Sequence, residues 1–491
     1  MQTAIENLLA QFETADIFPV VSRFPADLFT PFSAYMKIAD NATQSFLFES
    51  VEGGETLARY SFLGANPREI VRDNNQGVLR ITREKEEIID LNIFEYLREY
   101  FGNLTVAKVG GLPSFIGGAV GNFEFDAVGL FEPCLKREIS KPRAEFAIYD
   151  ETIAFDHAKQ EVIITKLLFG AEDKESFRNH IVAAFERNKN TAAKLLEPIP
   201  KRNKPTKGEI DSELRSKFGQ DSFINAVNEI KEQIAAGECY QVVISRAFER
   251  RTNASAESIY RALRSLNPSP YMFLISRGTE VLIGASPETL IRVRDRELEY
   301  RPIAGTVPRG KTQDEDARLA AKMKADEKER AEHIMLVDLG RNDLGRVAKF
   351  GTVRVRELMA VEKFSHVQHL VSYLFAELDP KFDRFDALVA CFPAGTVTGA
   401  PKIRAIEIIH KLEPEPRGFY SGAVGYIDYA DNLDVCIAIR TMRLSDGIAR
   451  IQSGAGIVAD SNAEREFQET IQKANGLLRA IELAEGGKYD I

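Results

Sequence analysis

The chain has 491 residues, of which 44% are hydrophobic, and its formal net charge at pH 7 is −9. A chain of this size can bury a large apolar core and is expected to form more than one lobe. The acidic balance disfavours nucleic-acid binding, which needs a basic face. No apolar stretch nears the length of a membrane span, and the first residues carry no basic leader, so we expect a cytoplasmic protein with no membrane segment.

Cysteine usage is typical of a protein from a reducing compartment. The four cysteines are scattered and include no Cys-x-x-Cys pair, so the sequence predicts neither a zinc site nor a disulfide framework. Each is expected to be a small buried apolar residue. They are Cys134, Cys239, Cys391 and Cys436.

The first part of the chain contains short strand-like runs, for example at 45–48 and 162–168, mixed with helical stretches. A basic, proline-broken run without apolar periodicity then predicts an exposed linker over 197–213. This linker separates an N-terminal region, 1–196, from a C-terminal region, 214–491.

The C-terminal region has clearer elements. Apolar residues at helical spacing from Phe223 to Ile234 predict a helix that stops at Gly237. The later predicted elements are a strand at 240–244, a helix at 255–266, a strand pair at 271–276 and 280–284, a single helix over 314–337, a helix with Pro401 in its first turn, strands at 422–428, 433–441 and 448–453, and a last helix. Strands in hairpins with helices grouped apart indicate an α+β fold.

The stretch 392–473 is rich in groups that bind small anions. Arg440 ends a predicted apolar strand, and a predicted turn at 454–456 is glycine-rich, which lets backbone N–H groups approach a ligand closely. The side chains of Tyr420, Arg440 and Lys473 are suited to hold carboxylates. The stretch therefore predicts a site for an anionic small molecule.

Two Glu-x-x-Glu pairs, Glu329 with Glu332 and Glu466 with Glu469, each place two carboxylates on one face of a predicted helix. Two such helices can hold Mg²⁺, which prefers hard oxygen ligands and keeps positions for water and substrate. The alternative interpretation of either pair alone is a solvated helix face.

Five motifs stand out by their length. They are Ala285-Ser-Pro-Glu288, Arg301-Pro-Ile-Ala-Gly-Thr306, Ala331-Glu-His-Ile-Met-Leu-Val-Asp-Leu-Gly-Arg-Asn-Asp343, Pro-Ala-Gly-Thr-Val-Thr-Gly-Ala-Pro-Lys at 393–402, and Gln452-Ser-Gly-Ala-Gly-Ile-Val458. Together they resemble the chorismate-utilising enzymes, and among these the large (component I) subunits of anthranilate synthases. The resemblance covers nearly the whole chain, and the motifs stand in the family's order.

This resemblance implies two interlocked lobes built on antiparallel β-sheets in a sandwich-like arrangement, with helices packed outside. It implies that region 1–196 carries part of a feedback site and that region 214–491 binds chorismate and catalyses the reaction. The implied cofactor is Mg²⁺, held by the two Glu-x-x-Glu pairs.

The resemblance also implies a reaction type. Glu288 matches the general acid that helps the 4-hydroxyl of chorismate to leave, a role that needs burial to raise the pKa of its carboxyl; a helix N-cap position is the alternative. Family members that add water carry a lysine base where this chain has Gln241, and members that aminate C4 carry a nucleophilic lysine where it has Ala304. Ammonia already has a free lone pair and needs no base, so both residues favour amination at C2 followed by pyruvate loss, which yields anthranilate.

The remaining contacts are implied residue by residue. His369 matches a histidine near C2 that acts in the elimination step, although a lone histidine in an apolar stretch is also a common core residue. The other residues expected around chorismate are Thr396, Gly454, Ala455 and Gly456 as hydroxyl and backbone donors, Tyr420 and Arg440 on the enolpyruvyl carboxylate, Lys473 with Mg²⁺ on the ring carboxylate, and Ala304, Gly305 and Thr306 beside the substrate.

The sequence contains no ammonia-generating motif. None of the cysteines lies in a glycine-flanked nucleophile turn; Cys239, for example, is flanked by Glu238 and Tyr240. The resemblance implies a separate glutamine amidotransferase subunit (component II) that docks and channels ammonia, with a heterotetramer as the expected assembly.

A second ligand site, for tryptophan as a feedback inhibitor, is implied by Leu47-Phe-Glu49-Ser50, by the Arg-Tyr-Ser run at 59–61 and by the segment 267–272. Two lobes that share one pocket give a route for inhibition. The alternative is ordinary turn chemistry. The expected tryptophan contacts are Glu49, Ser50, Arg59, Tyr60, Ser61, Asn267, Pro268, Pro270, Tyr271 and Met272.

A rival function comes from Gly305-Thr-Val-Pro-Arg-Gly310-Lys311-Thr312, which matches the phosphate-loop pattern and precedes a predicted helix. Three acids at 314–316 lie beside the supposed phosphate cradle, and the apolar run 334–337 continues a helical pattern where a nucleotidase needs a strand. Isochorismate or salicylate synthase, a C4-aminating synthase and this nucleotidase are the alternatives, in that order.

Overall fold

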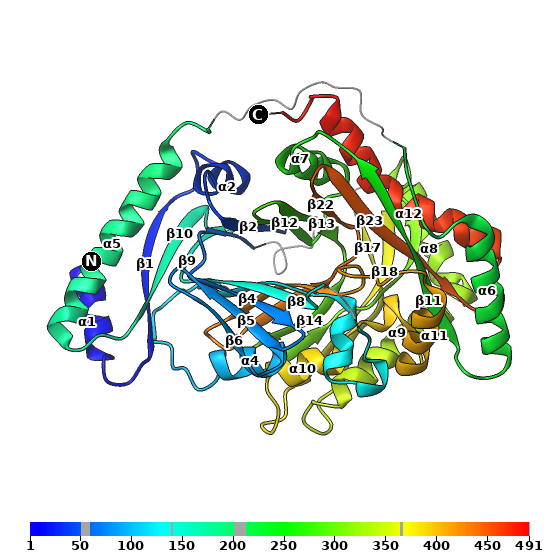
Figure 1. Ribbon diagram of the computed structural model, residues 1–491, viewed down its shortest axis with the longest axis horizontal. Coiled ribbons are helices and arrows are strands. Elements are labelled where there is room, and N and C mark those ends of the chain that lie inside the picture. Colours follow the sequence, from blue (N-terminus) through cyan, green and yellow to red (C-terminus); the bar gives the residue numbers. More distant parts are fainter. Residues whose placement is uncertain (51–58, 139–140, 201–212, 364–366, 491) are drawn as a thin grey trace.

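The computed structural model describes residues 1–50, 59–138, 141–200, 213–363 and 367–490. Two large antiparallel sheets form the centre of the molecule, and helices pack around them (Figure 1). This arrangement confirms the predicted α+β class. The predicted linker lies mostly outside the described residues, since 201–212 fall in a gap.

The first sheet has 11 strands. In spatial order they are β1 (Ile17–Pro25), β10 (Glu161–Phe169), β9 (Glu151–Asp156), β3 (Tyr60–Ala65), β2 (Gln44–Glu49), β12 (Tyr271–Arg277), β13 (Glu280–Ser286), β22 (Thr441–Ser445), β23 (Ile448–Ile457), β11 (Gln241–Arg251) and β19 (Gly399–Ala400).

The second sheet has 12 strands. They are β16 (Ile303–Pro308), β18 (Val367–Glu377), β15 (Glu297–Tyr300), β14 (Thr289–Arg294), β21 (Leu433–Ile437), β20 (Ala423–Asp428), β7 (Gly118–Phe123), β8 (Ala144–Tyr149), β4 (Glu69–Asn74), β5 (Gly77–Thr82) and β6 (Glu86–Ile89), with β17 (Arg354–Lys363) paired to β18.

Helices cover the outer surfaces of both sheets (Figure 1). They are α1 (Gln2–Ala10), α2 (Pro31–Ile38), α4 (Ile93–Phe101), α5 (Lys174–Leu196), α6 (Gln220–Ala235), α7 (Ala256–Leu266), α8 (Gln313–Ala325), α9 (Glu327–Gly345), α10 (Arg384–Cys391), α11 (Lys402–Leu412) and α12 (Ala463–Glu485), and the short 3₁₀ turns are η1 (Phe125–Leu130), η2 (Pro133–Leu135) and η3 (Gly395–Val397). None of the helices in the described ranges is both long and apolar enough to cross a bilayer.

The two sheets pack face to face over an apolar layer. Phe46 and Phe273 from the first sheet contact the same buried cluster as Val120 and Val424 from the second. Both sheets also mix strands from the two sides of the predicted linker, because β2 pairs with β12 and β7 pairs with β20. The two halves of the sequence are therefore interlocked within one sandwich-like structure.

The chain passes between the two sheets at several points, two of which lie side by side. Between β13 and β14 it crosses at Pro287 and Glu288, and between β21 and β22 it crosses at 438–440. The amide of Ala285 donates to the carbonyl of Arg440 (3.0 Å), and the amide of Ile437 donates to the carbonyl of Glu288 (3.0 Å). These bonds hold the two crossings side by side at the place where the sheets diverge.

Several predicted elements are wrong in detail. The single helix over 314–337 is two helices, α8 and α9, because the carboxylate of Asp326 caps the amides of Lys328 and Glu329 and restarts the helix. The strand 433–441 is β21 followed by a sheet crossing and β22. Pro401 precedes α11 as its N-cap residue and is outside the first turn.

Candidate active site

Glu288 lies on the first crossing and is buried. No helix starts there, so the N-cap alternative is wrong. Burial raises the pKa of its carboxyl to about 8, against the opposing effects of the Thr396 hydroxyl, the Ile303 amide and the Arg301 charge. A carboxyl in this state keeps its proton at neutral pH, as a general acid requires.

His369 comes from β18 and faces the β16 segment that carries Ala304, Gly305 and Thr306. Its Nδ1 lies 2.9 Å from the carbonyl oxygen of Gly305 and 3.1 Å from the Thr306 hydroxyl. Because a carbonyl can only accept, Nδ1 carries the proton and Nε2 is the basic nitrogen of the neutral ring. Burial lowers the pKa of this imidazole, which favours that neutral form.

The predicted turn at 454–456 is wrong: these residues lie inside β23, paired with β11. The two glycines allow side chains from other parts of the protein to approach the strand closely. A Cβ on Gly454 would lie 2.9 Å from the Tyr420 hydroxyl, and one on Gly456 would lie 2.5 Å from the Gln241 amide nitrogen. The strand therefore brings Tyr420 and Gln241 against one stretch of backbone, and Ala455 between them is buried.

A cavity of about 140 Å³ opens beside these strands. It is lined by Arg440 from the second crossing, Thr306, His369 and Lys473, all of which the sequence predicted. Lys473 donates to the carbonyl of Gly454 (3.0 Å) and pairs with Glu469 (2.6 Å). The structure thus brings two cationic side chains and the histidine to one small opening.

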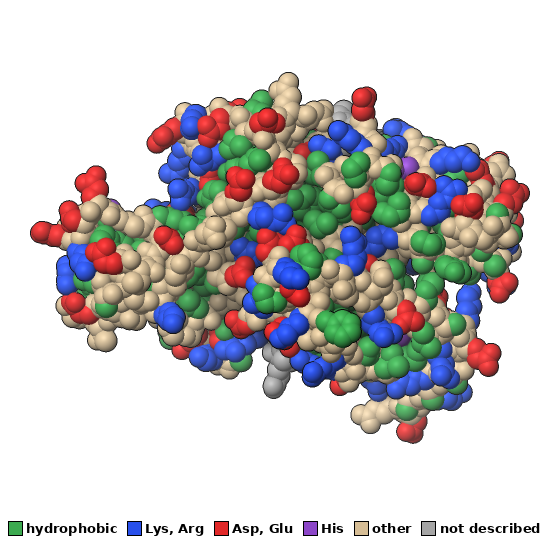
Figure 2. Space-filling view, turned by 90° about the horizontal axis from the view of Figure 1, so that it is seen from below, with side chains coloured by type: hydrophobic (Ala, Val, Ile, Leu, Met, Phe, Trp, Pro, Cys, Tyr) green, Lys and Arg blue, Asp and Glu red, His purple; other side chains and the backbone are tan. Residues whose placement is uncertain are grey.

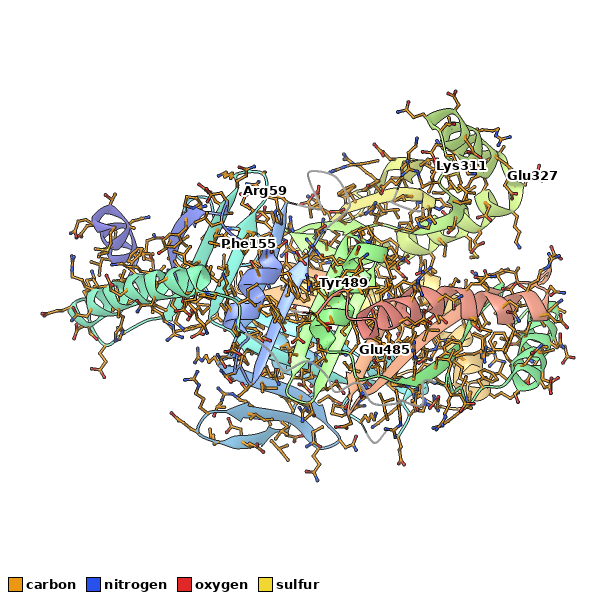
Figure 3. All side chains as sticks on the ribbon, turned by 90° about the horizontal axis from the view of Figure 1, so that it is seen from above. Arg59, Phe155, Lys311, Glu327, Glu485 and Tyr489 are labelled. Atoms are coloured by element: carbon orange, nitrogen blue, oxygen red, sulfur yellow. The ribbon has the colours of Figure 1, made fainter. Side chains whose placement is uncertain are left out.

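The four predicted metal-binding glutamates lie on α9 and α12. In Figure 3, the helices α8, which follows Lys311, and α9, which begins at Glu327, are drawn above α12, which ends at Glu485. Each of the four is half-buried. They are Glu329, Glu332, Glu466 and Glu469.

The charges of these glutamates act on one another across the two helices. Burial is the main cause that raises the pKa of Glu329 and of Glu332, and the charge of Glu469 on the opposite helix raises both further. Burial and Glu469 likewise raise the pKa of Glu466. Lys328 and Lys473 offset part of this repulsion, and the clustered oxygen donors are suited to a hard divalent cation. As the side chains stand, however, no three His, Cys, Asp or Glu residues of the described part converge into a metal-binding group.

A larger cavity, about 540 Å³, lies between the sheets, and it collects most of the residues predicted for tryptophan. Glu49 is buried in the wall of this cavity. Its carboxylate accepts a hydrogen bond from the Tyr260 hydroxyl (2.7 Å) and forms an ion pair with Arg264 (3.1 Å). The predicted residues in its lining are Glu49, Ser50, Arg59, Tyr60, Pro270, Tyr271 and Met272.

Three predicted tryptophan contacts lie elsewhere. Asn267 and Pro268 line the smaller cavity, because the segment from α7 to β12 runs between the two cavities. Ser61 is buried, and its hydroxyl contacts Nε2 of His157 (2.8 Å) outside the lining.

The phosphate-loop pattern forms no phosphate cradle. Its first residues belong to strand β16, in an antiparallel sheet. The amide of Gly310 donates to the carboxylate of Asp316 (2.6 Å), and the amide of Lys311 donates to Glu315 (2.8 Å). Carboxylates thus occupy the positions that phosphates would need. On the face in Figure 2, basic and acidic side chains are interspersed, with no continuous basic surface among the described residues.

Sequence reasoning missed several lining residues of the smaller cavity. Gly476 and Leu477 follow Lys473 by one turn on α12 and share its face, so helical spacing was the available signal. Leu263 and Val367 come from other elements and carry no local signal.

The chain is similar to known proteins over nearly its whole length. Residues 43–479 match the family described as chorismate binding enzymes. The chain is 41% identical over 479 residues to anthranilate synthase component 1 of Acetivibrio thermocellus, which covers 96% of each chain, and 39% identical over 503 residues to that of Aquifex aeolicus, covering 99% of each. The crystal structure of anthranilate synthase component I from Streptococcus pneumoniae superimposes with a TM-score of 0.74 at 34% identity, covering 93% of this chain and 99% of that one.

Proposed function

The chain belongs to the chorismate-binding enzymes and, among them, to the anthranilate synthase component 1 family, and we propose that it joins ammonia to C2 of chorismate and releases pyruvate, giving anthranilate. The observation that carries the residue-level proposal is the buried Glu288, whose raised pKa, about 8, suits a general acid. Glu288 protonates the 4-hydroxyl, which leaves as water, while ammonia adds at C2 and both ring double bonds shift, from C1–C2 to C1–C6 and from C5–C6 to C4–C5.

The second half of the reaction restores the aromatic ring. The basic Nε2 of His369 accepts the C2 proton, the bond between C3 and the enolpyruvyl oxygen breaks, and pyruvate leaves. The contact of Nδ1 with the Gly305 carbonyl supports this role, because it fixes the tautomer in which Nε2 is unprotonated.

The choice of nucleophile follows from Gln241 and Ala304. An amide cannot deprotonate water, and alanine cannot attack C4, so neither the water-adding nor the C4-aminating reaction has its required lysine. Gln241 is buried beside Gly456, and Ala304 is buried next to the His369 partner Gly305.

Binding of the two substrate carboxylates is assigned to the cationic wall of the smaller cavity. Arg440 and Tyr420 hold the enolpyruvyl carboxylate, and Lys473 holds the ring carboxylate. Thr396 adds a hydroxyl beside Glu288. Mg²⁺ bound by Glu329, Glu332, Glu466 and Glu469 would neutralise charge at the ring carboxylate.

Two further parts of the proposal concern the source of the ammonia and the inhibition of the reaction by tryptophan. A glutamine amidotransferase partner provides ammonia; the name of the relatives, anthranilate synthase component 1, supports the existence of a second component. Tryptophan binds in the larger cavity, where seven of the predicted contacts gather, and inhibits by favouring one arrangement of the packed sheets.

A reconstitution experiment tests the proposal. The chain alone, given chorismate, Mg²⁺ and an ammonium salt, is expected to form anthranilate and pyruvate, and glutamine is expected to replace ammonium only after the partner subunit is added. Use of glutamine by the chain alone would contradict the proposal that a separate subunit supplies the ammonia. Hydrolysis of ATP without chorismate would support the alternative function, that of a nucleotidase.

A further inference from the structure

Arg301 is among the largest completely buried side chains of the protein, and the reaction as proposed above gives it no direct role. Its Nη2 pairs with the carboxylate of Glu362, while its Nε and Nη1 have no hydrogen-bond partner among the described residues. A buried guanidinium with a single carboxylate partner depends strongly on that partner for its position.

A third side chain completes this contact. The hydroxyl of Tyr373 donates to the same Glu362 carboxylate, and the centre of the Tyr373 ring lies 5.1 Å from the guanidinium carbon of Arg301. Tyr373 therefore holds Glu362 by a hydrogen bond and Arg301 by its ring face. We call these three residues the Arg301 anchor.

The residues that follow Arg301 in the chain connect the Arg301 anchor to Glu288 and His369. Two residues after Arg301, the backbone of Ile303 lies close enough to Glu288 to lower the pKa of its carboxyl. The next residues of β16 supply the Gly305 carbonyl and the Thr306 hydroxyl that contact His369. The segment 301–306 thus touches both the proposed acid and the proposed base.

The anchor also reaches the larger cavity. Tyr373 lines that cavity, and so does Phe375, two residues further along β18. His369 lies on the same strand four residues before Tyr373, and side chains at i and i+4 share one face of a strand. One face of β18 therefore runs from the smaller cavity to the larger one.

We propose that Tyr373 and Glu362 are positioning residues for the reaction, which hold Arg301 and the segment 301–306 against Glu288 and His369, and that Tyr373 makes this hold depend on the ligand in the larger cavity. This inference rests on the proposed function, in which chorismate reacts at the smaller cavity and tryptophan binds in the larger one.

The coupling follows from shared contacts. A tryptophan that turns or displaces the Tyr373 ring removes one donor from Glu362, and Arg301 then loses part of its support. The Ile303 amide moves with Arg301 and withdraws from Glu288. By linkage, chorismate that draws the segment into place weakens tryptophan binding by the same factor.

Tyr373→Phe isolates the hydroxyl, because it keeps the ring in the cavity wall. The coupling is measured as the ratio of tryptophan Kd values with and without saturating chorismate and Mg²⁺, in the absence of ammonia. The chain contains no tryptophan, so the fluorescence of the added ligand reports binding without a tryptophan background from the protein. We expect a ratio of about 5 or more in the natural chain and close to 1 in Tyr373→Phe.

A second readout tests positioning without tryptophan. When Arg301 and the Ile303 backbone move away from Glu288, their lowering effect on its pKa is lost, so the alkaline limb of the kcat profile is expected to move to higher pH in Tyr373→Phe. A residue that only maintains the fold would not shift this limb. Phe375→Leu is the matched control, since it alters the same cavity wall without touching the anchor: it should change the tryptophan Kd while the coupling ratio and the limb stay at their natural values.

The outcomes separate this inference from the proposals beneath it. A Tyr373→Phe chain with the natural coupling ratio and an unmoved alkaline limb overturns the inference. Absence of tryptophan binding in the natural chain overturns the feedback site instead, and the limb shift still decides the positioning role. A natural chain that forms no anthranilate overturns the proposed function itself.

Discussion

Burial sets the acid–base properties of individual side chains in the candidate site. The pKa of Glu288 is raised to about 8 and that of Tyr420 to about 12, and burial is the first cause in both cases. The pKa of His369 is lowered for the same reason. Desolvation disfavours whichever form is charged, so one property of the site produces a protonated acid and a neutral base at the same pH.

The acid role of Glu288 predicts the pH dependence of turnover. At a fixed concentration of free ammonia, kcat is expected to fall as the pH rises through about 8, because the carboxyl loses its proton. Glu288→Gln keeps the size of the side chain but cannot donate this proton, and it should lower kcat by roughly 10²–10⁴. An alkaline limb that persists in a slow Glu288→Gln enzyme would assign the limb to another group.

The same shift affects stability. The folded-state pKa of Glu288, about 8, exceeds its ordinary value of 4.5, so its stabilising contribution is complete below pH 4.5 and is lost as the pH rises through about 8. Glu288→Gln should therefore flatten the decline of the unfolding free energy between these pH values, as measured by urea denaturation.

Residue identities were more predictable than residue surroundings. The sequence predicted that Glu288 must be buried, and it is. It also predicted a turn at 454–456 because glycines are typical of turns, whereas these glycines make room for Tyr420 and Gln241 beside a strand. Close approach by residues distant in sequence leaves no local pattern, so it could not be found without the fold.

At the scale of elements, facing carboxylates on α9 and α12 predict a role for a divalent cation. A ligand that binds only the folded state raises its stability by mass action. We expect added Mg²⁺ to raise the melting temperature of the natural chain and to do so less in Glu332→Gln, which should also lose most of its turnover because an amide is a weaker ligand than a carboxylate.

Glu464→Gln is the control for this prediction, because it removes one negative charge from an exposed position on α12, the helix that carries Glu466 and Glu469. Equal Mg²⁺ responses in Glu332→Gln, Glu464→Gln and the natural chain would contradict the metal site. Turnover that survives chelation of divalent ions would do so as well.

The element boundaries show which signals were local. Asp326 followed by Glu329 is a helix-start pattern, and it was present in the sequence inside the run predicted as one helix. The crossing at 438–440 was not visible, because the apolar pattern continues from β21 into the next sheet. Arg440 consequently lies on a crossing with a left-handed backbone (φ 49°), which directs it to the cavity.

At the scale of the whole molecule, two sheets enclose the larger cavity, and filling it is expected to uncouple tryptophan from turnover. Ser50→Phe adds a ring to the cavity wall at the end of β2. The tryptophan concentration for half inhibition should rise at least about tenfold, a cost of roughly 1.4 kcal/mol in binding, with only a modest loss of activity.

Thr43→Phe is the control, since it places the same ring at an exposed position just before β2. It should leave inhibition at the natural level. Unchanged tryptophan sensitivity in Ser50→Phe would move the inhibitor site away from the larger cavity.

The interlocked topology was implied by the resemblance and by nothing in the local patterns. Antiparallel pairing between β2 and β12, more than 200 residues apart, requires knowledge of long-range contacts. The fold class could therefore be predicted, and many of the named residues do line the two cavities, while the partition of 267–272 between these cavities could not be predicted.

The central claim is that this site adds ammonia, and not water, at C2 of chorismate. The most direct measurement is the full set of products formed from chorismate and Mg²⁺ with saturating ammonium and with none. The account predicts anthranilate and pyruvate in equal amounts with ammonium, and unreacted chorismate without it. Isochorismate or salicylate in the ammonium-free reaction would show that Gln241 does not exclude water, and a para-aminated product would show that Ala304 does not prevent attack at C4.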